Sequence, residues 1–240
     1  MSFVMPLIVM LVTLSSIIVH SSLPAAAQAS GTTDVLSLVA PPDSRPLNST
    51  YGDWGAKWWQ WVYSFPSSQN PLFDETGERC AIDQNGTVWF LVGTFGGSVM
   101  RQCTIPAGTS LFFPLVNTEA SSAGGDGTNE EELRLAAKTQ IDRVSSLKAI
   151  IDGVQIPDLQ KYRAQSQLYT ITLPTDNIMG VEPGTTSSIA EGYWIFLNPL
   201  PPGNHEIIFG GSAGDPSVTS SMNFVTEVTY HLTVTNSTTP

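Results

Sequence analysis

The clearest candidate for chemistry in this sequence is ligand binding by aromatic side chains, because four of the six tryptophans fall within eight positions. On a helix, at about 100° per residue, Trp59 and Tyr63 lie one turn apart on the same side. A neighbouring polar sector contains Asp53, Lys57 and Gln60, the first two at a favourable i, i+4 spacing. Stacking faces beside hydrogen-bonding groups suit a sugar or another flat polar ligand. We therefore predict that these five residues form an exposed ligand-binding platform.

The same segment also has the pattern of a buried helix. Four aromatic residues fall within a sector of roughly 60° at helical spacing, namely Trp54, Trp58, Trp61 and Phe65. Such a stripe is typical of a helix that faces a core. If the helix lies between a sheet and another element, Trp59 is buried as well, which is the commonest fate of large aromatic residues. The exposure of Trp59 separates the two interpretations.

Serine hydrolase chemistry is suggested by one short match and opposed by its context. Residues 210–214 read G-G-S-A-G, which matches the G-x-S-x-G nucleophile elbow, and Asp215 or Glu227 and then His231 follow it in the right order. The elbow needs a turn from a strand into a helix, whereas here Pro216 is followed by a strand pattern. We therefore interpret the segment as a glycine-rich loop.

A metal centre has little support in the residues. His20 lies in the predicted leader, which leaves His205 and His231 and excludes a three-histidine zinc site. A mixed site that uses His205 with Glu206 or Glu119 is a weak alternative, to which no ligand spacing points. No phosphate-binding or dinucleotide fingerprint is present. The sequence therefore predicts neither a metal nor another cofactor, and paired carboxylates are the route by which the chain could act as a hydrolase.

The first 29 residues are predicted to be a signal peptide. Residues 3–19 are almost wholly apolar, and Ala27 and Ala29 give the A-x-A pattern of a cleavage site. No Lys or Arg precedes this run, and its length approaches the lower limit of about 17 residues for a membrane span. An uncleaved N-terminal anchor is therefore the alternative. Cleavage after Ala29 predicts a protein that is secreted or held in the cell envelope.

Other features of the chain fit an exported protein. Cys80 and Cys103 are predicted to form a disulfide, and sequons at Asn48, Asn85 and Asn236 are candidate glycosylation sites. The formal net charge is -11, so nucleic acids and anionic membranes, which need clustered positive charge, are poor candidate partners. No second apolar run is long enough to span a membrane, so we expect no span after signal cleavage.

The rest of the chain is predicted to be mainly β, as a mostly antiparallel β-sandwich with two packed helices. Residues 86–116 have the turns and β-branched residues of a β-meander, with the two cysteines on its flanking strands, and residues 224–234 alternate between apolar and polar. Apolar spacing predicts helices at 52–65 and 129–147. A capping box at Thr128 and Glu131 would begin the second.

These elements give a simple domain organisation. We expect a signal peptide at 1–29, an extended lead-in at 30–47, one β-sandwich-like domain at 48–235 and a loose tail at 236–240.

Several longer motifs resemble a family of uncharacterised secreted microbial proteins. They include the pattern W-x-x-x-W-W-x-W, here W-G-A-K-W-W-Q-W, and the pattern C-T-x-P-A-G, here C-T-I-P-A-G. Others are V-W-F-L-V-G-T-F-G-G and L-P-P-G-N-H-E-I-I-F-G-G. The resemblance covers most of the chain after the leader. It implies secretion, and it assigns no activity and no catalytic residues.

The sequence thus favours a secreted or cell-envelope protein that binds a polar ligand such as a glycan. Binding is favoured over catalysis because no catalytic constellation stands out. One alternative is an extracellular hydrolase that uses carboxylates or a His/carboxylate metal site. The other is an envelope structural protein without a small-molecule site. None of the patterns specifies an oligomeric state.

Overall fold

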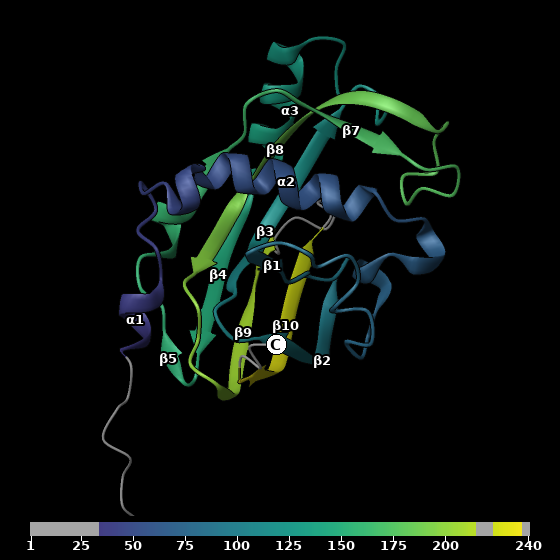
Figure 1. Ribbon diagram of the computed structural model, residues 1–240. Helices are drawn as coiled ribbons and strands as arrows, with labels where there is room; N and C mark the ends of the chain where they lie inside the picture. The colour runs from purple at the N-terminus through teal and green to yellow at the C-terminus, as the bar shows by residue number, and fades with distance from the viewer. Residues whose placement is uncertain (1–33, 215–222, 237–240) are drawn as a thin grey trace, which may run out of the picture. The chain divides into compact units, whose positions relative to one another are not determined.

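Two β-sheets face each other in the computed structural model, which describes residues 34–214 and 223–236 (Figure 1). The predicted signal peptide lies outside the described residues. The helices of the described residues are α1 (Val35–Leu38), α2 (Tyr51–Tyr63) and α3 (Glu130–Ile141). Short 3-10 turns are η1 (Pro46–Asn48), η2 (Ser67–Gln69), η3 (Pro71–Phe73) and η4 (Leu159–Tyr162). The prediction of a mainly β fold with two packed helices is confirmed.

Sheet A is built around two long antiparallel strands. Its members are β1 (Val88–Phe90), β3 (Ser110–Ser121), β8 (Gly184–Leu197), β6 (Arg163–Gln165) and β7 (Tyr169–Leu173). β3 pairs with β8, and β6 and β7 both pair with β8 in the antiparallel direction. β1 joins the opposite side of β3 in the parallel direction.

Sheet B contains β2 (Gly97–Pro106), β10 (Phe224–Thr235), β9 (Gly203–Ala213), β4 (Val144–Ile151) and β5 (Val154–Gln155), in that order. β10 pairs antiparallel with β9 and parallel with β2. β2 therefore lies in sheet B, whereas β1 and β3, which precede and follow it, lie in sheet A. The predicted β-meander at 86–116 is wrong because the chain crosses between the sheets twice in this region.

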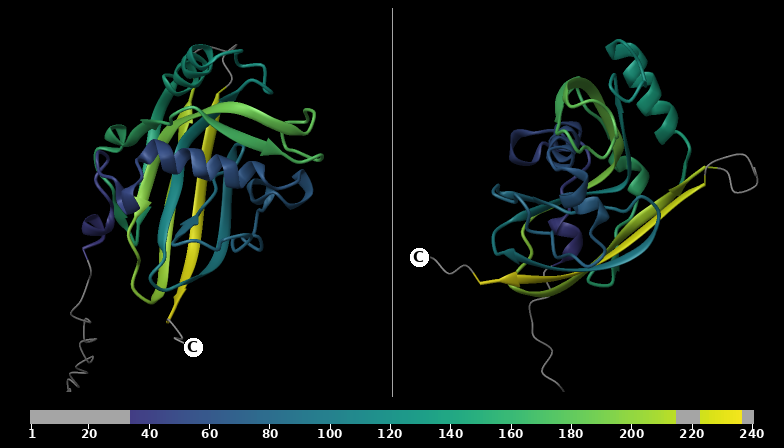
Figure 2. Two further views of the ribbon diagram at one scale, coloured as in Figure 1. Left: turned by 45° about the horizontal axis from the view of Figure 1, so that its top comes forward. Right: turned by 90° about the vertical axis from the view of Figure 1, so that its right-hand side faces the viewer.

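The main core fills the space between the two sheets. Sheet A contributes residues such as Leu111, Phe113 and Ile195, and sheet B contributes Phe209 and Tyr230. β10 shows the predicted alternation, since its inward residues are buried and most of those between them are exposed to some degree. The right-hand view of Figure 2 shows α2 in purple on one side of these layers and β10 in yellow on the other. The outer face of each sheet is thus distinct from this shared core.

Helix α2 covers the outer face of sheet A. It begins with a capping box in which Thr50 accepts a hydrogen bond from the Asp53 N–H and Asp53 accepts one from the Thr50 N–H. Gly55 allows close approach, because a Cβ there would lie only 3.0 Å from the Trp194 ring. The predicted core stripe is confirmed at Trp54, Trp58 and Phe65, whereas Trp61 is only partly buried.

Helix α3 packs on sheet A through a small apolar cluster, formed by Leu133 and Ala137 with Ala120 and Ile189. Its first turn is capped by Asn129, which accepts from the Glu132 N–H, so the predicted pairing of Thr128 with Glu131 is wrong. The predicted helix at 129–147 is also too long. Strand β4 begins at Val144 because these residues pair with β9 instead.

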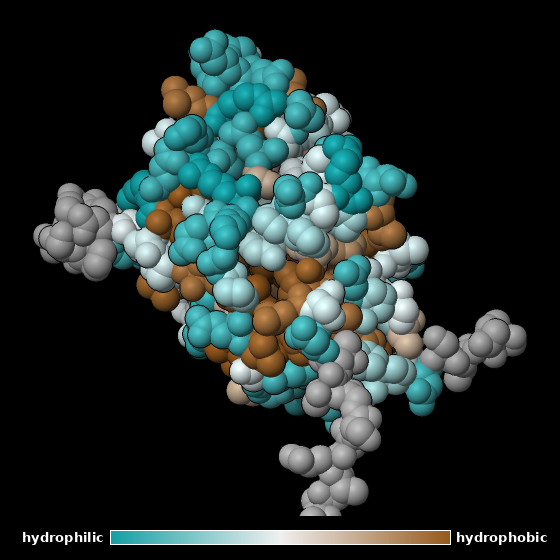
Figure 3. All heavy atoms as spheres, turned by 90° about the vertical axis from the view of Figure 1, so that its left-hand side faces the viewer, coloured by the Kyte–Doolittle hydropathy of each residue, from teal (hydrophilic) through white to brown (hydrophobic). Residues whose placement is uncertain are grey.

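The segment before α2 contacts the fold. Residues 30–47 were predicted to form an extended lead-in, but α1 lies within them, and Val39 forms an isolated bridge with Leu197. Val39 and Ala40 are buried, while Leu36 and Leu47 are exposed. α1 and β5 lie on the side of the molecule seen in Figure 3, where hydrophobic residues gather between hydrophilic ones. Part of the predicted lead-in therefore belongs to the packed structure.

The predicted disulfide between Cys80 and Cys103 is confirmed. Cys103 lies in β2, but Cys80 lies in a turn and not on a second flanking strand. The bond therefore ties residues 78–83 to β2, rather than two strands to each other.

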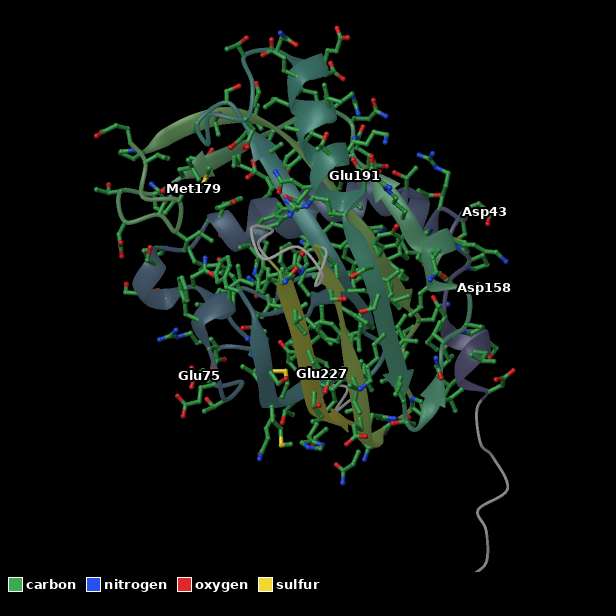
Figure 4. All side chains as sticks on the ribbon, turned by 180° about the vertical axis from the view of Figure 1, so that it is seen from behind. Asp43, Glu75, Asp158, Met179, Glu191 and Glu227 are labelled. Carbon is green, nitrogen blue, oxygen red and sulfur yellow. A yellow bond between two sulfur atoms is a disulfide. The ribbon has the colours of Figure 1, made fainter. Side chains whose placement is uncertain are left out.

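The outer face of sheet B carries exposed side chains and is not covered by any helix of the described residues (Figure 4). Glu227 of β10 projects from this face in Figure 4. In one row across three strands, Gln102 of β2 is opposite His231 of β10, which is opposite Glu206 of β9. This face is therefore polar where the outer face of sheet A is aromatic.

Candidate functional site

The exposure of Trp59 and Tyr63 decides between the two interpretations of α2. Trp59 is 8% exposed and Tyr63 is 7% exposed, so the predicted exposed platform is wrong. Their rings stack on each other with centroids 5.1 Å apart, and the Trp59 Nε1–H donates to the carbonyl of Thr118 at 3.1 Å. The helix buries both of its apolar sides because it lies between sheet A and the segments that follow α2 and β1.

The three polar residues of the predicted platform lie elsewhere. Asp53 is held in the capping box, where burial raises its pKa but hydrogen bonds from Thr50 hold it below the usual value overall. Lys57 donates to Ser49 and lies over the Trp54 ring, 4.1 Å from its centroid. Gln60 donates to the carbonyl of Thr170. The structure therefore does not bring Asp53, Lys57 and Gln60 together with the stacked aromatic pair.

Trp59 and Tyr63 instead form part of the wall of a pocket of about 260 Å³, which we call the aromatic pocket. Its walls come from α2, from η3, from the loop after β1 and from the ends of β3 and β10. The lining residues are Trp58, Trp59, Tyr63, Leu72, Gly93, Thr94, Phe95, Asn117, Thr118, Glu119 and Phe224. Most of these walls are apolar, and a few polar groups from β3 enter between them.

Glu119 is the one carboxylate among the described residues that line this pocket. Its Oε2 accepts a hydrogen bond from the Tyr63 hydroxyl at 3.0 Å, and its Oε1 accepts one from the Ser188 hydroxyl at 2.6 Å. Burial raises the pKa of Glu119, although hydrogen bonds from Ser188, Ser121 and Tyr63 oppose the shift. Burial and the nearby Glu119 carboxylate raise the pKa of Tyr63. A weakly solvated carboxylate therefore faces an aromatic wall.

One polar atom that lines this pocket, and a second behind its wall, have no hydrogen-bond partner among the described residues. They are the buried Nδ2 of Asn117 and the buried Oγ1 of Thr226. Asn117 lines the pocket, and Gly192 on β8 leaves room for it, because a Cβ there would lie 2.6 Å from the Asn117 Cβ. Thr226 Oγ1 lies 4.0 Å from a Cβ built on Gly93, another lining residue. A buried polar group without a partner costs about 1–3 kcal/mol, so this arrangement favours a ligand that supplies one.

A second hollow of about 240 Å³ adjoins the aromatic pocket and shares Asn117, Thr118 and Phe224 with it. Its other walls come from the end of α3, from β9 and from Arg143. Arg143 lines only this second hollow, so it provides a control position beside the aromatic pocket.

A wider groove of about 770 Å³ lies against sheet B, and we call it the polar groove. It is lined by residues including Gln102, Thr104, Asp152, His205, Glu206, His231 and Thr233. His205 places Nδ1 2.7 Å from Asp152 and Nε2 2.8 Å from the carbonyl of Pro201. His231 lies 3.7 Å from Glu206. The polar groups of the polar groove therefore pair with one another or face solvent.

The weak metal alternative at His205 and Glu119 finds no support. His205 lies in β9 of sheet B and Glu119 in β3 of sheet A, and the two have separate partners. No group of three His, Cys, Asp or Glu residues that could hold a metal ion occurs in residues 34–214 and 223–236. Ser212 of the G-x-S-x-G match lies within strand β9, and its hydroxyl hydrogen-bonds with that of Ser146. The segment is therefore neither a nucleophile elbow nor the predicted glycine-rich loop. Asp215 lies outside the described residues.

The sequence did not reveal that Asn117 and Phe95 line one pocket or that the Thr226 hydroxyl is buried without a partner among the described residues. Asn117 follows an apolar run and carries only the signal of a strand near its end. Thr226 lies in the alternating pattern of β10, where a threonine is expected on either face. The pocket is formed by segments far apart in the chain, so only the folded arrangement reveals it.

The exposed asparagines of the predicted sequons, Asn48, Asn85 and Asn236, are all accessible for modification. Among the described residues, no helix has the length and apolar character needed to cross a membrane.

Comparisons with known proteins add no function. No family model matches the chain, and no curated protein matches it. The structure of PbICP-C in complex with falcipain-2 has a TM-score of 0.23 and 13% identity, over 62% of this chain and 99% of that chain. The solution structure of Amebosin has a TM-score of 0.17 and 10% identity, with the same coverage of 62% and 99%. Similarity at this level does not establish a shared fold, and the predicted family resemblance stays a prediction.

Proposed function

We propose that this chain binds a small ligand rich in hydroxyl groups, a sugar unit of a glycan in the first place, in the aromatic pocket. The observation that supports this most is the meeting of an aromatic wall, the Glu119 carboxylate and the unpaired Asn117 Nδ2 in one pocket. A sugar hydroxyl can donate to a carboxylate and accept from an amide at the same time. Its C–H face packs against aromatic carbon.

The size of the pocket supports a small ligand. Its volume of about 260 Å³ lies just below the roughly 300–1,000 Å³ that is common for sites of drug-sized ligands. Charge supports a neutral ligand, because no Lys or Arg lines the pocket among the described residues. Glu119 already accepts hydrogen bonds from Tyr63 and Ser188 and is too enclosed to attract a hydrated ion.

A hydrolase is the second candidate, since burial raises the pKa of Glu119 and thereby suits it to a general acid. Glycoside hydrolysis, however, needs a second carboxylate about 5–10 Å from the first. Glu119 is the one carboxylate that lines the pocket among the described residues; Asp126 is near enough to raise the pKa of Glu119, but it is not a lining residue and accepts a hydrogen bond from the Ser121 N–H. Binding without hydrolysis is therefore the better explanation of this geometry.

The proposed location is outside the cell or in the cell envelope. It is supported by the leader pattern of residues 1–29 and by the Cys80–Cys103 disulfide, which persists in oxidising compartments.

A glycan array followed by titration of tryptophan fluorescence tests the proposal, because Trp58 and Trp59 line the pocket. We expect binding of at least one class of saccharide. Glu119→Gln and Asn117→Ala should each weaken it about tenfold, the loss that corresponds to one hydrogen bond of about 1.4 kcal/mol. Arg143→Ala, in the adjoining hollow, should bind as the wild type does. Absence of binding by the wild type, or equal binding by Asn117→Ala, would show that the pocket is not the site. Cleavage of the bound saccharide would favour the hydrolase.

A further inference from the structure

An exposed pair of aromatic rings borders the aromatic pocket. Phe73 is 51% exposed and Phe95 is 57% exposed, and their ring centroids lie 5.3 Å apart. Phe95 also lines the pocket, so the pair continues from its wall onto the surface. We call this pair the phenyl platform. Two large apolar side chains that remain together in solvent at the rim of a pocket are typical of a binding surface.

A buried arginine holds the two segments that carry the phenyl platform. Arg101 is 1% exposed, and its Nε donates to the carbonyl of Asp74 at 2.6 Å. Its Nη1 donates to the carbonyls of Val92 and Gly93 at 2.6 and 2.9 Å. Asp74 directly follows Phe73, and Gly93 lies two residues before Phe95. Because burying a guanidinium is costly, these bonds fix the two segments relative to each other.

Further bonds stiffen each segment. Asn70 is fully buried and caps η3, since its side chain accepts from the Leu72 N–H and donates to the carbonyl of Val62. Asp74 is buried and accepts from the N–H groups of Thr76, Gly77 and Arg79. The exposed rings are therefore presented by a preorganised support, which reduces the entropy lost on binding.

Most residues that follow the platform rings in the sequence are polar or glycine, and the exposed Val225 is an apolar neighbour, because its carbonyl lies 3.8 Å from a Cβ built on Gly96. The exposed Glu75 and Thr76 follow Phe73 and Asp74, and the exposed Gly96, Gly97 and Ser98 follow Phe95. A long apolar tail would need a continuous apolar channel, whereas these polar neighbours limit the apolar contact to about one ring-sized group. A second sugar unit, which has an apolar C–H face and polar edges, fits such a surface.

We infer that the ligand contains at least two linked sugar units, the first in the aromatic pocket and the second packed on the phenyl platform. This inference rests on the proposed function of the pocket. It assigns Phe73 and Phe95 as binding residues for the second unit, and Arg101 as the residue that positions them. The chain then recognises the end of an oligosaccharide rather than a free monosaccharide.

Calorimetry with the saccharide found on the array, as monosaccharide, disaccharide and trisaccharide, tests the inference. We expect the wild type to bind the disaccharide at least tenfold more tightly than the monosaccharide. Phe73→Ala should remove most of this difference, because Phe73 does not line the pocket. Leu135→Ala, which removes an equally exposed apolar side chain from α3, should retain it.

The two proposals fail in different ways. If Glu119→Gln weakens monosaccharide binding about tenfold but Phe73→Ala keeps the preference for the disaccharide, the inference is overturned and the pocket remains the site. Equal affinity of the wild type for all three lengths also overturns the inference alone. If no saccharide binds the wild type, both proposals fall. Thermal melts that match the wild type confirm that Phe73→Ala is folded, as expected for a side chain that is half exposed.

Discussion

The aromatic pocket and the polar groove differ in whether their polar groups contact solvent and have hydrogen-bond partners. In the groove, His231 and Glu206 are exposed to solvent, and Thr233 donates to Asn204. At the pocket, Asn117 Nδ2 is buried without a partner among the described residues, as is Thr226 Oγ1 behind the lining residue Gly93, and Glu119 is enclosed by α2 and β8. Polar residues on an open sheet face need no special explanation, because water satisfies them. A polar residue under a helix carries a cost and therefore carries more information about function.

The largest expected effect concerns the aromatic wall itself. Trp58 is 1% exposed, and Trp58→Ala should lower the free energy of unfolding by about 3–5 kcal/mol, because the substitution leaves a large cavity in the packed face of sheet A. His231→Ala, on the open face, should change the free energy of unfolding by no more than about 0.5 kcal/mol. Urea unfolding of both variants measures the contrast. Equal losses would mean that the two regions are packed alike.

Two neighbouring residues of β2 sharpen the comparison. Arg101→Met should destabilise the protein by about 2–4 kcal/mol, because the carbonyls of Asp74, Val92 and Gly93 lose their donor. Gln102→Met, at the adjacent exposed position in the polar groove, should change stability by no more than about 0.5 kcal/mol. Chemical denaturation gives both values. A loss at Gln102 as large as that at Arg101 would show that burial is not the cause.

Replacing each of two threonines of β10 by valine should have different effects on the free energy of unfolding. Thr226→Val keeps the shape of a buried side chain and removes an unpaired hydroxyl, so it should stabilise the fold by about 1 kcal/mol. Thr233→Val removes an exposed hydroxyl that donates to Asn204 and should be neutral or slightly destabilising. Thermal melts compare the two. If Thr226→Val destabilises instead, its hydroxyl has a partner in solution and the pocket is more hydrated than proposed.

The smallest effect is a dependence on pH. The pKa of Glu119 is raised above its usual 4.5, so its contribution to stability is fully present below about pH 4.5 and is lost as the pH rises through the raised value. Unfolding of wild type and Glu119→Gln between pH 4 and 8 should show the wild type losing stability relative to the variant as the pH increases.

Asp74 provides the opposite case when the same measurement is extended down to about pH 2. Burial opposes its ionisation, but hydrogen bonds from Arg79, Gly77 and Thr76 lower its pKa overall. Its contribution is therefore present above its usual pKa and is lost as the pH falls through the lowered value. The same trend for Glu119→Gln and Asp74→Asn would contradict the assignment of one of the two shifts.

Features that depend on short stretches of chain were predictable from the sequence. The spacing of Trp54 and Trp58 and the stop at Pro66 predicted α2, and the two cysteines predicted their disulfide. The alternation in residues 224–234 predicted β10. Each of these signals is local, so no knowledge of distant partners was needed.

Features that depend on distant partners were not predictable. The parallel pairing of β2 with β10 joins residues more than a hundred positions apart, and nothing in residues 86–116 indicates a change of sheet. The helical spacing through Val144 and Leu147 fits α3 equally well, but pairing with β9 prevails. The same reason explains why the predicted exposure of Trp59 is wrong, because the residues that cover its side chain come from β3 and from the loop after β1.

The position of β10 has a consequence for how the chain reaches its final state. β10 comes after all other described strands, yet it lies between β2 and β9 within sheet B. During synthesis from the N-terminus, β2 has no strand partner until residues 224–235 emerge from the ribosome. The pairings of β10 with β2 and β9 are therefore the last of sheet B to form, and that of β2 with β10 is a contact of long sequence separation, a kind that forms slowly.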